Sequence, residues 1–183
     1  MQPLPRPSFR KVSEAKLLCL PPVETLLLEP HLAQVPLQKL LDHTVTRLLE
    51  LQAEVLSNLE RRDLTLTCKW GLDGSTGHSR YKQVGVERDE LMFITTLVPL
   101  ELRSDQLVVW RNSTPSSPRF CRPLRISFEK ETTDRTRQEI ARVEAEITQL
   151  QPLQTDTTTV RYQLAMTMVC TIIEIYLLSI IIA

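Results

Sequence analysis

The residues best suited to chemistry lie in a glycine-rich segment near the middle of the chain. All four glycines of the 183-residue sequence fall between Gly71 and Gly85, and Asp73 stands among them. The segment directly follows a strand-like run that ends at Trp70, so the sequence predicts a sharply bending loop after a strand. A hard divalent cation prefers carboxylate oxygens held on a rigid element. Asp73 is therefore the candidate metal ligand, although Asp-Gly pairs most often serve a purely structural role in turns.

Composition argues against several other kinds of site. Basic and acidic residues both number 22, so the net charge is zero and no simple basic DNA-binding module is indicated. The four cysteines form no CxxC pair, which disfavours a zinc knuckle or a disulfide framework and is typical of reduced thiols in the cytosol or nucleus. His78 has no partner nearby in the sequence, and the acidic cluster Glu87, Asp89 and Glu90 is typical of a solvated turn.

Hydrophobic patterning divides the chain into four parts. Residues 1–36 hold seven of the twelve prolines and are predicted to be irregular, with at most a short helix near residues 16–20. Residues 37–62 carry leucines and valines at helical spacing and predict one amphipathic helix. Residues 63–169 predict a mixed α/β domain, and residues 170–183 form an apolar tail.

The α/β part is predicted as a group of strands, a helix and a further strand. Pro99 in the second strand suggests a bulge or an edge position, and Thr136 with Glu139 suggests a capping box in the helix. This order fits an incomplete ribonuclease H-like domain, and it also fits other α+β folds. The strands are expected at residues 64–70, 91–102, 107–110, 123–128 and 160–169, and the helix at residues 132–150.

The end of the chain has two interpretations. Residues 164–183 carry one charge, Glu174, and their length approaches that of a membrane span. The alternative interpretation assigns residues 160–169 to a soluble strand, because they alternate with period two, and leaves a tail too short to span the hydrocarbon core. The clean alternation favours the soluble strand, which would also leave an exposed sheet edge.

Several segments of this part of the chain resemble a group of transposon-derived animal proteins. That group is similar to the catalytic core of the larger recombination-activating protein of V(D)J recombination and to Transib transposases. The resemblance covers roughly residues 64–169. The segments that carry it are residues 68–77, 81–83, 95–100, 116–124 and 129–132.

The resemblance implies a ribonuclease H-like fold in which three acidic residues hold two Mg²⁺ or Mn²⁺ ions that cut and join DNA. Asp73 matches the first acidic residue of that family, which lies in an Asp-Gly turn. The second acid is expected immediately after Val169, where this chain has Cys170. The third acid and the family's zinc-binding residues are expected further on, so the resemblance implies a truncated protein that is inactive alone.

We therefore predict a truncated transposase- or recombinase-derived protein in the nucleus, with DNA as its partner and Asp73 as a vestigial metal ligand. One alternative is a small tail-anchored membrane protein with a cytosolic α/β domain, held in the membrane by residues 164–183. A second alternative is a helix-mediated interaction module that forms a homo-oligomer through the helix from Leu37 to Leu59.

Overall fold

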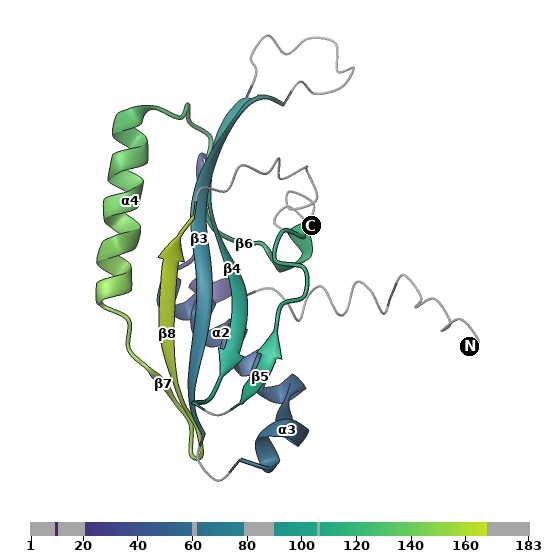
Figure 1. Cartoon of the computed structure of the whole chain (residues 1–183). Coiled ribbons are helices and arrows are strands. Elements are labelled where there is room, and N and C mark those ends of the chain that lie inside the picture. The colour runs from purple at the N-terminus through teal and green to yellow at the C-terminus, as the bar shows by residue number, and fades with distance from the viewer. Residues whose placement is uncertain (1–9, 11–20, 60–61, 79–89, 106, 168–183) are drawn as a thin grey trace, which may run out of the picture.

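A curled mixed sheet with few helices forms the body of the chain (Figure 1). The computed structural model describes residues 10, 21–59, 62–78, 90–105 and 107–167. The short helix expected near residues 16–20 and the apolar tail lie outside these residues. The fold is therefore mixed α/β, as the sequence predicts.

The described residues form the following elements in chain order. The helices and strands are η1 (Val23–Thr25), β1 (Leu27–Glu29), β2 (Leu32–Gln34), α2 (Leu37–Leu51), α3 (Ala53–Ser57), β3 (Asp63–His78), β4 (Glu90–Arg103), β5 (Val108–Arg111), η2 (Pro118–Phe120), β6 (Arg122–Ser127), α4 (Thr133–Thr148), β7 (Leu153–Gln154) and β8 (Thr159–Met166).

The sheet has the strand order β1-β2-β6-β4-β3-β8-β7, and β5 pairs with β4 off this path. Strands β3, β4 and β6 form an antiparallel group. Helix α4 follows β6 in the chain, and β8, which comes after α4, pairs parallel with β3. The central strand β3 is thus flanked by an antiparallel neighbour on one side and a parallel one on the other.

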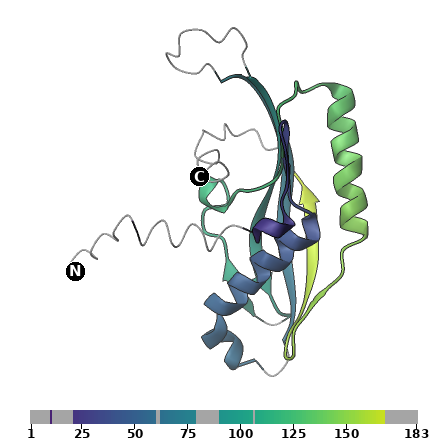
Figure 2. The same cartoon turned by 180° about the vertical axis from the view of Figure 1, so that it is seen from behind.

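The main core lies on one face of this sheet. Leu64, Leu66, Cys68 and Trp70 alternate along β3, and each is 2% exposed or less, as expected for a strand with one buried face. They belong to the same cluster as the apolar side of α2 and Val143 of α4. Figure 2 shows α2 lying across the face of the sheet that is turned away in Figure 1. The leucine stripe predicted from Leu37 onward is mostly buried within the chain's own core.

The opposite face of the sheet also carries a small apolar cluster. Met92 and Ile94 of β4 pack with Ile126 of β6, and Ala33 of β2 packs against them. Because β4 is buried on both sides here, its sequence is almost continuously apolar rather than alternating.

Most of the predicted strands and the second helix are confirmed, with shifts of a few residues at their ends. The irregularity expected at Pro99 is also confirmed. The β3–β4 register shifts between Thr67 and Cys68, where Pro99 is the partner of Cys68. Proline lacks an N–H for the ladder, so it is tolerated next to such a shift.

Four predictions about local structure are wrong. The single helix expected over residues 37–62 is two helices, because Gln52 leaves the helical region with φ −107° and ψ 17°. Thr132, not Thr136, is the N-cap of α4, and its hydroxyl accepts from the N–H of Arg135 at 3.3 Å. The proline-rich part contains the β1–β2 hairpin. The glycine-rich loop is also absent as far as His78, because β3 continues through it.

Strand β3 continues through Gly71 and Gly74 because β4 pairs with these residues. Gly71, Asp73 and Gly74 pair with Thr96, Ile94 and Phe93 of β4 respectively. Ladder hydrogen bonds and buried β-branched partners thus outweigh the low strand preference of glycine.

Candidate functional site

Asp73 lies within β3 and not in a turn. It is paired with Ile94 on the antiparallel side. On the parallel side the β3–β8 pairing ends at Trp70 and Met166, so Asp73 lies beyond the last paired residue of β8. The carboxyl end of β8 therefore lies near this half-buried residue of β3.

Glu131 lies against β3 beside Asp73. It belongs to the connection between β6 and α4, and its side chain rests on Gly74. A Cβ atom at residue 74 would stand 2.5 Å from Cβ and 2.9 Å from Cδ of Glu131, closer than carbon atoms can pack. Gly74 is therefore needed for the close approach of Glu131, not for a turn.

The charge of Glu131 acts on Asp73. Partial burial raises the pKa of Asp73, and the negative charge of Glu131 raises it further, while a hydrogen bond from the Gly74 N–H lowers it. Like charges that are close together favour the protonated form. The fold thus brings Glu131 near enough to act on Asp73 electrostatically. The residue that Glu131 contacts is Gly74, and successive residues of a strand point to opposite faces, so the Asp73 side chain lies on the other face.

A shallow groove of about 540 Å³ opens beside Gly74 and Glu131, and Asp73 is not among the residues that line it. Helix α4 begins at its wall, and Lys130 and Arg137 add positive charge next to Glu131. The groove is lined by Gly74, Lys130, Glu131, Thr132, Thr133, Thr136 and Arg137.

The described carboxylates are too few for two divalent cations, and of Asp73 and Glu131 only Glu131 lines the groove. Two carboxylates are the kind of ligand that Mg²⁺ or Mn²⁺ takes, with waters completing the coordination. The part of the chain that the structure describes contains no group of three or more His, Cys, Asp or Glu residues suited to a metal. His78 and Glu90 are paired in the β3–β4 ladder, whereas Glu87 and Asp89 lie outside the described residues. Cys170 lies outside them as well.

The position of α4, and so of Glu131 just before it, is fixed by a buried carboxylate. Glu139 is 5% exposed and accepts hydrogen bonds from Thr95 Oγ1 at 2.5 Å and Arg142 Nη2 at 2.6 Å. Arg125 Nη1 of β6 donates to it at 3.2 Å. Burial alone raises the pKa of Glu139, but Arg142, Thr95 and Arg125 together outweigh burial and hold the pKa below its usual value.

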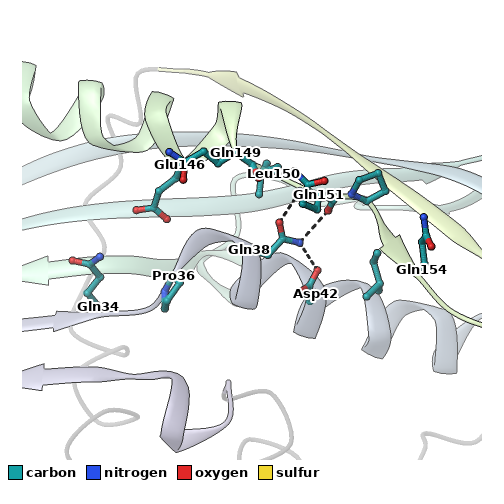
Figure 3. A pocket seen from close by; sticks show the side chains of 11 residues that line it. Gln34, Pro36, Gln38, Asp42, Glu146, Gln149, Leu150, Gln151 and Gln154 are labelled. Carbon is teal, nitrogen blue, oxygen red and sulfur yellow. Dashed lines mark hydrogen bonds between the residues drawn. The ribbon is translucent and has the colours of Figure 1, made fainter.

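A second cavity, of about 550 Å³, lies between α2 and the end of α4 (Figure 3). At this cavity, Gln38 Oε1 accepts from the N–H of Gln151 at 2.9 Å, and Gln38 Nε2 donates to the Gln151 carbonyl oxygen at 3.1 Å. Asp42 accepts from Gln38 Nε2 at 2.7 Å and from the Tyr162 hydroxyl at 2.6 Å. Burial and then Asp42 raise the pKa of Tyr162. These polar groups bond one another and tie α2 to the end of α4 and to β8.

Comparison with known proteins leaves the family of the chain open. No protein-family model matches the sequence, and no curated protein matches it either. Within the described residues, no helix is long and apolar enough to cross a membrane. Of the proposed span at residues 164–183, only residues 164–167 are described.

Proposed function

We propose that the chain is a transposase-derived, recombinase-like protein whose ribonuclease H-like domain retains one divalent-cation site and does not cleave DNA alone. The contact of Glu131 with Gly74, and the effect of its charge on the neighbouring Asp73, carry this proposal. The order of β3, β4 and β6 in an antiparallel group, then α4, then β8 parallel to β3, supports it. This order fits such a domain, and it also fits other α+β folds.

The site is built for cation binding and not for strand transfer. Asp73 and Glu131 repel each other while both are ionised, and a cation bound near both would relieve that repulsion. When bound, Mg²⁺ or Mn²⁺ would supply Lewis-acid polarisation of a phosphate oxygen. In-line phosphoryl transfer by the two-metal route needs a second ion that the described carboxylates are too few to hold.

The groove beside the site supports DNA as the partner and hence a nuclear location. Lys130 and Arg137 line this groove next to Glu131. Cations at these positions attract phosphate groups irrespective of base sequence.

Mn²⁺ binding to the full chain tests this function. Electron paramagnetic resonance titration should find one bound Mn²⁺ per chain, displaced by excess Mg²⁺. Asp73→Asn and Glu131→Gln should each weaken binding about tenfold, or about 1.4 kcal/mol, because each removes one anionic ligand. Asp134→Asn is the matched control, since its carboxylate lies nearby in α4 and is 87% exposed; it should leave the affinity unchanged.

The same preparation should leave supercoiled plasmid DNA intact in Mn²⁺. Two outcomes would contradict the proposal. One is Mn²⁺ affinity that is equal in the wild type and in Asp73→Asn while circular dichroism shows both to be folded. The other is plasmid nicking by the wild type that Asp73→Asn abolishes, since this would make the domain an active nuclease.

A further inference from the structure

Strand β8 has an open edge along most of its length. On one side it pairs with β3 from Thr159 to Met166. On the other side β7 covers only Thr159 and Val160. From Arg161 to Met166, this second side has no strand partner in the part of the chain that the structure describes (Figure 1).

The backbone groups that face this open edge can be identified. The N–H groups of Thr159 and Thr167 donate to the carbonyl oxygens of Arg62 and Trp70, at 2.9 Å and 2.8 Å. Because successive residues of a strand direct their backbone groups to opposite sides, Tyr162, Leu164 and Met166 direct theirs to the open edge. Their N–H groups take no part in the pairing with β3.

The edge lacks the features that usually block strand addition. Strand β8 contains no proline, no glycine and only one charged residue, Arg161. By contrast, the edge strand β1 at the other end of the sheet has three residues, ends in Glu29 and precedes Pro30. Natural proteins protect edges by short strands, charges and prolines, and β1 has these features while β8 does not.

We propose that the open edge of β8 pairs antiparallel with β8 of a second copy of this chain, about a two-fold axis at Leu164. In this register Tyr162 faces Met166, Gln163 faces Ala165, and Arg161 faces Thr167. No like charges oppose each other.

The side chains in this register also complement each other. Tyr162 and Leu164 already pack against the main core, and Met166, which is 48% exposed, lies on the same face of β8. The pairing extends that core across the axis and covers Met166 with Tyr162 of the second copy. This interaction surface is independent of the cation site.

Sedimentation of the full chain at increasing concentration tests the pairing. The wild type should reach twice the mass of the 21.1-kDa chain. Met166→Pro should remain a monomer, because proline removes an N–H that only the second copy uses. Met166→Thr is the matched control: it keeps the N–H and should still dimerise. Circular dichroism should show both variants folded.

Cross-linking tests the register itself. Gln163→Cys and Ala165→Cys chains, with Cys19, Cys121 and Cys170 changed to serine, should form a disulfide only when the two variants are mixed. A non-hydrogen-bonded antiparallel pair brings its two residues within disulfide range. A wild type that stays monomeric would overturn the pairing, and another segment would then cover the edge. A dimer that survives Met166→Pro, or a mixture that does not cross-link, would overturn it as well.

Discussion

Replacing Glu139 by alanine is expected to lower the free energy of unfolding by about 3–5 kcal/mol. Glu139 is almost fully buried, and it bonds Thr95 of β4, Arg125 of β6 and Arg142 of its own helix. Without this carboxylate, two guanidinium groups lose their shared buried partner, and α4 loses its attachment to the sheet. Urea unfolding followed by circular dichroism measures the change. Glu144→Ala, at an exposed position of the same helix, is the control and should change stability by less than about 0.5 kcal/mol.

The Glu139 effect should depend on pH. The pKa of Glu139 is lower in the folded chain than its ordinary value of 4.5, so its ionised form stabilises the fold. This contribution is complete above pH 4.5 and is lost as the pH falls through the folded pKa. The advantage of the wild type over Glu139→Gln should therefore shrink in acid. An advantage that stays constant as the pH is lowered below the folded pKa would contradict the ionised network.

Gly74→Ala is expected to destabilise the chain by about 2–3 kcal/mol, near the upper end for an overpacked site. The added Cβ would lie 2.5 Å from Cβ of Glu131, so the β6–α4 connection has to move away from β3. The variant should therefore also weaken Mn²⁺ binding, although it removes no ligand. Unfolding and the Mn²⁺ titration together measure both effects.

A double-mutant cycle separates this contact from a general cost of alanine in β3. Glu131→Gly removes the atoms that clash, so the double variant should be more stable than the sum of the single variants predicts. The coupling should be at least about 1 kcal/mol, within the range for residues in contact. Additive effects would mean that Glu131 does not rest on Gly74.

Much of the sheet could be predicted from local sequence. Period-two alternation marks β8, and dense β-branched and apolar residues mark β4, so both are found within a few residues of their observed ends. The extent of β3 could not be predicted in this way. Its glycines favour a loop when they are considered alone, and only the pairing with β4 keeps them extended. Such tertiary pairing is not visible in a local window.

The local sequence also fails to predict some features of the helices. The leucine stripe correctly predicts which face of α2 is buried, but it continues without interruption across Gln52, where the structure breaks the helix. Glu139 was predicted as part of a capping box, because its spacing from Thr136 has that form. Its actual role depends on Thr95 and Arg125 of two other strands, which the spacing within α4 cannot reveal.

Only half of the candidate site could be predicted from the sequence. Asp73 stands out in the sequence because it lies among the glycines, although the loop expected there is a strand. Glu131 does not stand out, because it is distant from Asp73 in the sequence and nothing near it suggests a ligand. Gly74 was the available signal, since a glycine inside a strand often marks a close approach by another part of the chain.

The location of bound Mn²⁺ in the full chain tests the proposed cation site most directly. Mn²⁺ added in small amounts broadens amide signals close to it in ¹H–¹⁵N spectra. The proposal predicts that Gly74 and Thr132, which line the groove with Glu131, lose intensity first, and that Asp73→Asn removes this loss. Broadening that begins instead around Asp42 and Glu146 in the second cavity, or that is uniform over the chain, would contradict a cation site at Asp73 and Glu131.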